Sequence, residues 1–259
     1  MIDIHCHILA DADDGANNIE ESIKMAKVAV NEGITKIIAT PHHKNGRYEN
    51  DREKILNKID QLQGELQKEK INIEILPGQE IRIYGEIVED LEKGELLTIG
   101  DNSSYMLIEL PHYHVPRYTY RLLYDLQVNG IIPVIVHPER NHEILEKPDL
   151  LYKLIKDGAL SQITAASITG MFGKRVKKLS FELIDHNLTH FIASDAHNTT
   201  MRSFHLRDAY DAIEKQIGVE TKFILQENAN LVCNNRMVYK EMPEKVKNNK
   251  IISFFTNRM

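Results

Sequence analysis

Two histidines separated by one residue, His5 and His7, stand near the start of the chain. The residues before them favour a β-strand, in which alternate side chains share a face, so His5 and His7 point together while Cys6 points away. Two convergent imidazoles can start a metal site. A pair of this kind also occurs on surfaces or by chance at a strand start, so further ligands are needed. An acidic run follows it, at Asp11, Asp13 and Asp14.

Further residues of metal-binding type follow the other predicted strands. These strands end at Thr40, Leu76, near Ile108, Val136 and Ala193. Parallel strands of α/β proteins build their active sites at this carboxyl end, where the loops converge. Such a distribution is stronger evidence for an active site than any one motif. The residues that follow the strand ends are His42, His43, Glu80, Glu109, His137, Glu139, Arg140, Asp195 and His197.

The chain alternates predicted strands with predicted helices. Asn17 or Asn18 can cap a first helix that Gly33 closes. The apolar positions of this helix are Ile19, Ile23, Ala26 and Val30, and those of a second helix are Ile55, Ile59, Leu62 and Leu66. Strands are predicted at Lys36 to Thr40, Ile71 to Leu76, Tyr105 to Ile108 and Ile132 to Val136, and a helix from Arg117 to Asn129. Further units run through Leu151 to Thr164, Arg175 to Ala193 and Ser203 to Ile217. This order predicts an α/β fold with a parallel sheet covered by helices, either open or closed into a barrel.

Composition limits the classes of protein that the chain could form. The 259 residues suit one domain, and we find no linker, low-complexity tract or solenoid repeat. A net charge of −6 argues against a general nucleic-acid binder. Two cysteines, Cys6 and Cys233, make no disulfide framework, and no signal peptide or spanning apolar stretch is present, so we expect a soluble cytoplasmic protein.

Together, these motifs resemble the polymerase-and-histidinol-phosphatase (PHP) superfamily. The HPERN block at 137–141, the DDGA stretch at 13–16 and the chain length are most similar to the manganese-dependent bacterial protein-tyrosine phosphatases of capsule and exopolysaccharide loci. The resemblance covers essentially the whole chain. It implies one phosphatase domain over 1–259, with a C-terminal tail from about 240, and a distorted (β/α)7 TIM-like barrel with its metal site at the carboxyl ends of the strands.

The resemblance also implies a ligand set for up to three divalent ions, Mn2+ above all, with iron or zinc possible. The first ion would be held by His5, His7, Glu80 and Asp195. Glu80 would bridge to a second ion held by Glu109 and His137, and the third would be held by Asp14, His42 and His197. Imidazole and carboxylate ligands without thiolate suit such metals in a hydrolytic site. The set would leave about two positive charges to complement a phosphate group. A structural zinc site would need fewer ligands.

Arg140 and Arg202 are the predicted catalytic arginines. Both follow strand ends, and arginine presents a planar donor fork that matches phosphate oxygens. Arg207 competes with Arg202, but it lies inside a predicted helix and is expected to face water. His43 is a further catalytic candidate, as an acid or base, or else a simple loop histidine.

The predicted mechanism does not use a cysteine nucleophile. The cysteine-dependent tyrosine phosphatases carry an arginine six positions after the cysteine, whereas this chain has Ala12 and Tyr239 there. A metal-bound hydroxide attacking phosphorus is the expected route. A phenolate leaving group, with a pKa of about 10, needs less protonic help than an alkoxide. Cys6 and Cys233 are then expected to pack as small apolar residues.

The resemblance implies that the substrate is a phosphotyrosyl protein, namely the tyrosine-rich tail of a bacterial tyrosine kinase and the substrates of that kinase. Tyr48, Tyr113 and Tyr118 lie in loops near strand ends, where they could contact the phenol ring or serve only for packing. The main alternative is a small-molecule phosphatase of histidinol-phosphatase type. Phosphodiester cleavage and a non-enzymatic metal-binding regulator of a kinase are weaker alternatives. The oligomeric state stays open, and stable membrane insertion is not expected.

Overall fold

The computed structural model describes residues 1–101 and 103–246. In these residues the strands are β1 (Ile2–Cys6), β2 (Lys36–Ala39), β3 (His42–His43), β4 (Glu74–Pro77), β5 (Glu80–Arg82), β6 (Tyr105–Glu109), β7 (Ile132–Val136), β8 (Leu160–Thr164) and β9 (Phe191–Ala193). The helices are α1 (Ile19–Asn31), α2 (Arg52–Lys68), α3 (Ile87–Glu92), α4 (Thr119–Val128), α5 (His142–Glu146), α6 (Asp149–Lys156), α7 (Ala165–Thr169), α8 (Lys174–Asp185), α9 (Leu206–Gln216) and α10 (Val219–Cys233). Short 3₁₀ turns lie at η1 (Ile99–Asp101) and η2 (Pro138–Arg140).

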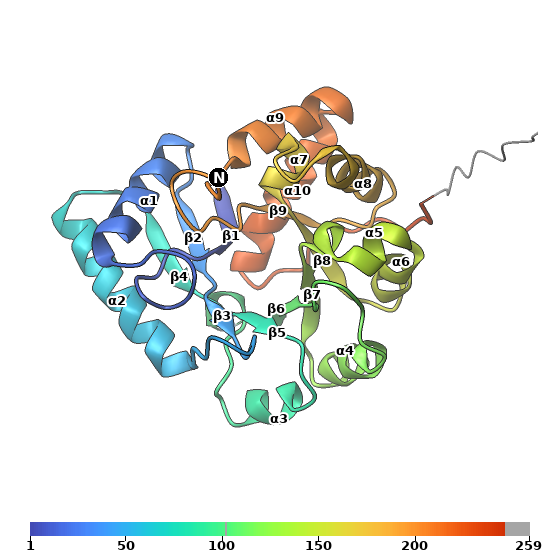
Figure 1. Ribbon diagram of the computed structural model, residues 1–259, viewed down its shortest axis with the longest axis horizontal. Helices are drawn as coiled ribbons and strands as arrows, with labels where there is room; N and C mark the ends of the chain where they lie inside the picture. The colour runs from blue at the N-terminus through green and yellow to red at the C-terminus, as the bar shows by residue number, and fades with distance from the viewer. Residues whose placement is uncertain (102, 247–259) are drawn as a thin grey trace, which may run out of the picture.

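The strands form two parallel sheets, with the orders β1-β2-β4 and β3-β5-β6-β7-β8-β9. The strands lie at the centre of the molecule and most helices lie around them (Figure 1). A parallel bridge between Cys6 and Ala196 brings the end of β1 beside the segment after β9. The α/β class and the parallel pairing predicted from the sequence are therefore confirmed.

Two short strands, β3 and β5, carry His42 and Glu80, whereas the sequence predicted loops at these positions. β3 continues β2 after two residues and β5 continues β4 after two residues. The Thr40 N–H donates to the Cys6 carbonyl and the Glu80 N–H donates to the Pro41 carbonyl, so the chain keeps its neighbours across these breaks. The strand predicted at Ile71 to Leu76 is shorter and shifted, because Ile71 is tied by its N–H to the C-terminus of α2 at Leu66.

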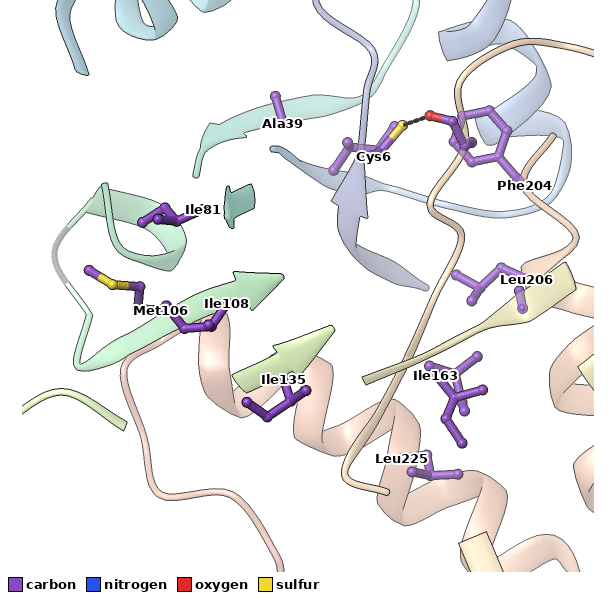
Figure 2. Close-up of a cluster of buried hydrophobic side chains, with 14 of the residues drawn as sticks. Cys6, Ala39, Ile81, Met106, Ile108, Ile135, Ile163, Phe204, Leu206 and Leu225 are labelled. Carbon is purple, nitrogen blue, oxygen red and sulfur yellow. Dashed lines mark hydrogen bonds between the residues drawn. The ribbon is translucent and has the colours of Figure 1, made fainter. Parts of the chain in front are cut away.

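Side chains on both faces of the strands are buried, as parallel sheets require. Ile108, Ile135 and Ile163 belong to the larger core between strands and helices (Figure 2). Their alternating neighbours on the strands, such as Leu107 and Val134, belong to a second cluster that includes residues of α10. The predicted apolar face of α2, formed by Ile55, Ile59, Leu62 and Leu66, is fully confirmed.

Two expectations for the outer helices need correction. Asn18 caps α1 as predicted, by accepting a hydrogen bond from the Glu21 N–H, but Val30 is 37% exposed because the buried face runs through Met25, Ala26 and Ala29. Helix α10 was not predicted, because few of its residues are buried and its apolar positions do not form a clear stripe. None of the described helices is long and apolar enough to cross a membrane.

The end of the chain is described only in part. Residues 234–246 have no helix or strand, and the Glu244 N–H donates to the His186 carbonyl after α8. Asn187 at the same place donates to the Met242 carbonyl. The first part of the predicted tail, 240–246, is thus bound to the domain, and residues 247–259 of that tail lie outside the described residues.

Candidate metal centre and active site

His5 and His7 converge as their spacing predicts. Their Nε2 atoms lie 3.2 Å apart, and each is within 3.4 Å of Oε2 of Glu80. Asp195 Oδ1 lies 3.7 Å from the Nε2 of His5 and 3.3 Å from that of His7. The two histidines and Glu80 are completely buried. These four side chains, predicted to hold one metal ion, are therefore adjacent.

Two residues that the sequence did not single out orient these imidazoles. The Nδ1 atom of His5 lies 3.0 Å from Oε1 of Gln162 on β8, and that of His7 lies 2.6 Å from Oδ2 of Asp13. Each acceptor holds the proton on Nδ1 and leaves Nε2 free to bind a metal. Asp13 lies in the acidic run and in the DDGA stretch at 13–16, but no role was predicted for it. Gln162 gave one signal, a long polar side chain in a strand whose five residues are all buried.

Glu80 stands at the middle of the cluster. Its Oε1 atom lies 2.7 Å from Nε2 of His137, and its Oε2 atom lies 2.8 Å from Nδ1 of His42. Burial alone would raise the pKa of Glu80, but the neighbouring histidines His42 and His5 hold this pKa well below its usual value. Glu80 therefore stays a carboxylate that can face more than one ion.

Glu109 and His137 also lie close to Glu80, and the His137 ring is 5.8 Å from the His5 ring between centroids. Burial and then the negative charge of Glu80 raise the pKa of Glu109 to about 7, while Arg82, 3.0 Å from its Oε1, opposes the rise. Burial and then the nearby Arg140 lower the pKa of His137 to about 4. His137 adopts a left-handed backbone with φ of 37° just after β7, which is uncommon for a residue with a side chain. A neutral imidazole beside a carboxylate of raised pKa suits a metal ion that would favour the ionised form.

Asp14, His42 and His197 form the outer part of the cluster. Oδ1 of Asp14 is 3.4 Å from Nε2 of both His42 and His197. The side chain of Asp14 is 39% exposed, so this part of the cluster opens to solvent. The His197 ring stacks on the His7 ring at 3.7 Å between centroids, which joins this group to the first.

The two predicted arginines reach the cluster, and their competitor does not. Arg140 donates a hydrogen bond to Asp195, and Nη1 of Arg202 lies 3.2 Å from Oδ2 of Asp14. Arg207 is exposed and instead donates to the carbonyls of Asn31 and Glu32 at the end of α1. It therefore binds the carboxyl end of a helix, where a cation is favourable.

His43 points away from the cluster. It alternates with His42 on β3, so its ring lies on the opposite face of the strand. The ring is buried and lines a separate cavity of about 750 Å³ with Glu49 and Asp51. The catalytic role predicted for His43 gains no support from this position, because strand alternation separates it from the ligands.

The three tyrosines predicted near the site have different surroundings. The ring of Tyr48 is parallel to that of His42, with 6.3 Å between centroids. Tyr113 is 74% exposed and contacts the rings of His112 and His142. Tyr118 instead donates its hydroxyl to the Ile83 carbonyl, so it serves the packing of the fold.

Neither cysteine is placed to act as a nucleophile. Cys6 is completely buried in the larger core (Figure 2), and its Sγ atom lies 3.5 Å from the Ala196 carbonyl oxygen. Burial, followed by the charges of Asp3 and Asp195, raises the pKa of the Cys6 thiol well above its usual value. Cys233 is partly buried beside the second core cluster. Both therefore stay protonated thiols, the unreactive form.

The donor set fits divalent metal ions. In the described part of the chain, several buried site atoms lack a hydrogen bond of normal geometry: Nδ1 of His42, Oε2 of Glu80, Oε2 of Glu109 and Nε2 of His197, although the first two lie 2.8 Å apart. Buried polar atoms of this kind normally have a partner, and metal ions would supply it here. Three groups have ligand atoms within 4.8 Å of one another: His7, Asp14, His42 and His197; His5, His7 and Glu80; and His42, Glu80 and Glu109.

Several known proteins are similar to this chain over most of its length. The tyrosine-protein phosphatase YwqE of Bacillus subtilis is 52% identical over 255 residues, which cover 98% of this chain and all of YwqE. CapC of Staphylococcus aureus is 45% identical over 243 residues, 94% of this chain and 95% of its own. A crystal structure from work on YwqE and on CpsB of Streptococcus pneumoniae, described as metal-dependent tyrosine phosphatases, superposes with a TM-score of 0.93 at 53% identity, over 95% of this chain and 100% of the other.

The family comparison covers most of the chain. Residues 1–234 match the family described as "Capsular polysaccharide synthesis, CpsB/CapC". This range holds all the residues of the cluster, from His5 to Arg202. The chain therefore belongs to the CpsB/CapC family.

Proposed function

We propose that this protein is a metal-dependent protein-tyrosine phosphatase. The observation that carries the proposal is the convergence of imidazoles and carboxylates from β1, β3, β5, β6 and the segments after β7 and β9, beside two arginines. A protein named a tyrosine-protein phosphatase, 52% identical over nearly the whole chain, supports the same activity.

The proposed metal ligands are the residues that the sequence predicted. His5, His7, Glu80 and Asp195 would hold one ion, Glu80, Glu109 and His137 a second, and Asp14, His42 and His197 a third. Bound divalent ions would lower the pKa of a coordinated water and neutralise phosphate charge. We propose Mn2+ as the ion, because imidazole and carboxylate ligands without thiolate suit it. Iron and zinc are compatible with the same ligands.

The residues of the chain would bind and orient the phosphate. Arg140 contacts Asp195, and Arg202 contacts Asp14 and lies 3.5 Å from Asp195, so both reach carboxylates of the cluster. Guanidinium groups there can donate to the equatorial oxygens of a phosphoryl group during in-line transfer. The exposed side of Asp14 gives the phosphate an approach from solvent. A phenolate leaves without a strong acid, so His43 is not needed to protonate it.

We also propose the finer features of fold and partners. β1, the pair β2 and β3, the pair β4 and β5, and β6 to β9 would act as the strands of a distorted (β/α)7 barrel in one phosphatase domain. The bridge between Cys6 and Ala196 supports this arrangement. The natural substrate would be a phosphotyrosyl protein, with the tail of a bacterial tyrosine kinase as the proposed partner.

The test compares three substrates with manganese present: a phosphotyrosyl peptide, a phosphoseryl peptide of the same sequence, and histidinol phosphate. We expect the highest kcat/KM for the phosphotyrosyl peptide, loss of activity on chelation, and recovery with manganese. The variant Cys6→Ser should keep most of the activity, because a buried protonated thiol takes no part. Equal kcat/KM for the two peptides, a preference for histidinol phosphate, or an inactive but folded and metal-loaded Cys6→Ser variant would contradict the proposal.

A further inference from the structure

A short turn after α7 exposes two apolar side chains close to the proposed phosphate site. Met171 is 50% exposed and Phe172 is 39% exposed. Gly170 and Gly173, with φ of 95° and 91°, flank them in the left-handed region that favours glycine. The N–H groups of Gly170 and Met171 both donate to the Ala166 carbonyl, and that of Gly173 donates to the Gly170 carbonyl. The turn is thus internally bonded and holds both side chains outward.

The ring of Phe172 lies against one of the proposed phosphate-binding arginines. The guanidinium carbon of Arg140 is 4.9 Å from the centre of this ring, within the range of a cation–π contact. Arg140 also donates to Asp195, a proposed metal ligand. Arg140 therefore lies between the carboxylate of the cluster and the exposed phenyl ring.

The buried side chain of Glu139 holds the segment of Arg140 next to α7. Glu139, next to Arg140 in the chain, is completely buried, and its Oε1 atom accepts from the Thr164 N–H at 3.1 Å and from the Ser167 hydroxyl at 2.6 Å. Thr164 ends β8 directly before α7, and Ser167 lies within α7, the helix that leads into the exposed turn. The segment of Arg140 and the turn of Phe172 are thus tied together at both ends.

We propose that Phe172, helped by Met171, forms the apolar surface on which the phenyl ring of a phosphotyrosyl substrate packs. The inference rests on the proposed function, in which Arg140 donates to the phosphate. Because the exposed ring of Phe172 is 4.9 Å from the guanidinium carbon of Arg140, a phosphate ester held by Arg140 would have this apolar surface beside its phenyl ring. Phosphoserine has no ring to bury, so this contact favours phosphotyrosine.

The other aromatic residues near the cluster fit this role less well. Tyr118 donates its hydroxyl to the Ile83 carbonyl, and the ring of the exposed Tyr113 contacts the rings of His112 and His142. The ring of Tyr48 is parallel to that of His42, a proposed metal ligand, and its cation–π contact is with Arg47. Among the aromatic residues in the described ranges, the contact with a proposed phosphate-binding arginine belongs to Phe172.

The experiment measures binding of two phosphonates that cannot be hydrolysed, phenylphosphonate and methylphosphonate, to the manganese-loaded protein by calorimetry. Phe172→Ala should weaken phenylphosphonate roughly three- to tenfold and leave methylphosphonate unchanged. Phe172→Tyr should restore the preference, because it restores the ring. The matched control is Phe223→Ala on α10, whose side chain is 63% exposed outside the cluster. This control should change neither affinity.

The same variants separate the failure of this inference from failure of the proposed function. An equal loss for both phosphonates in Phe172→Ala would mean that the ring only supports Arg140, and it would overturn the inference. No loss of phenylphosphonate affinity would also overturn it. Wild-type protein that prefers phenylphosphonate but does not hydrolyse phosphotyrosyl peptides would refute the proposed activity and keep the ring contact.

Discussion

In several histidines of the cluster, Nδ1 contacts an oxygen of the protein and Nε2 faces the other proposed metal ligands. Nδ1 of His197 lies 2.9 Å from the Asp195 carbonyl, while His5 and His7 bond Gln162 and Asp13 in the same way. Such contacts fix the tautomer and the ring orientation, and they set how well a ligand binds its metal. The residues that bond Nδ1 of these histidines therefore contribute to metal affinity, although they do not bind the metal themselves.

Asp13→Asn should weaken metal binding about 10- to 100-fold, although Asp13 is not a proposed ligand. Burial alone would raise the pKa of Asp13, but the attraction of His7 lowers it to about 2, so it faces His7 as a carboxylate. An amide cannot supply that charge. The check is manganese affinity by calorimetry, with Asp11→Asn as the control, because Asp11 is exposed in the same acidic run. Equal affinities for Asp13→Asn and wild type would show that this carboxylate does not orient His7.

Alanine at Arg140 or Arg202 should lower kcat about 100- to 1,000-fold, because each substitution removes hydrogen-bond donors that stabilise the negative charge on the phosphoryl oxygens in the transition state. Metal content should stay near the wild-type level. Arg207→Ala should change kcat little, since Arg207 binds the end of α1. The measurements are steady-state rates and elemental analysis of each variant. Metal loss in the Arg140 or Arg202 variants, or a larger defect for Arg207→Ala, would reverse the assignment.

At the scale of elements, the site depends on short strand continuations that approach one another closely. β3 pairs with β5 and sets His42 opposite Glu80. The turn before β5 passes so near β2 that Gly78 has no room for a side chain, because a Cβ there would lie 2.5 Å from Cγ2 of Ile38. The absence of a side chain at Gly78 therefore lets the turn approach β2 and sets the position of Glu80.

Gly78→Ala should reduce the free energy of unfolding by about 1 to 3 kcal/mol, the usual cost of overpacking. It should also weaken manganese binding, because the turn that carries Glu80 must move. Gly85→Ala is the matched control, since nothing lies within 4 Å of a Cβ at Gly85. Urea unfolding and metal titration of both variants check the prediction. Wild-type behaviour of Gly78→Ala in both assays would mean that the turn can shift without cost.

At the scale of the whole molecule, a buried histidine outside the metal site couples stability to pH. The Nδ1 atom of His190 lies 3.2 Å from the Ser161 nitrogen, which donates to it, and the ring is 3% exposed. Burial, and then the charge of Lys240, lower the pKa of His190 to about 3. The folded protein thus keeps His190 neutral, whereas the unfolded chain takes up a proton near pH 6.5. The stability from this group is complete above pH 6.5 and is lost as pH falls toward 3.

Between pH 6.5 and pH 5 the unfolding free energy of the wild type should fall, and in His190→Gln this fall should be smaller by about 2 kcal/mol. The variant has no group at this position to protonate. The measurement is urea unfolding at both pH values, with His114→Gln as the control, because His114 is exposed. The same pH dependence in His190→Gln and wild type would contradict the assignment.

The sequence alone indicated which residue types could form the site and the alternation of strands and helices. Residue types decide which atoms can bind metal or phosphate, so His5, His7, Glu80 and Arg140 could be chosen before any fold was known. Local periodicity decides the type of element, because apolar positions repeat with the period of a helix or a strand. For that reason the face of α2 and the bounds of β7 were predicted correctly.

Only the tertiary structure decided which residues support the ligands and which stay apart from them. His5 and Gln162 are separated by 157 positions, and no local pattern links them. His42 and His43 are adjacent and of the same type, but the two-residue strand β3 turns them to opposite faces. The sequence did not predict β3, β5 and α10, because segments distant in sequence stabilise them. β3 pairs with β5, β5 pairs with β6, and α10 packs against β1 and β9. Contacts between distant segments form only when the whole chain packs, so they cannot be read from local sequence.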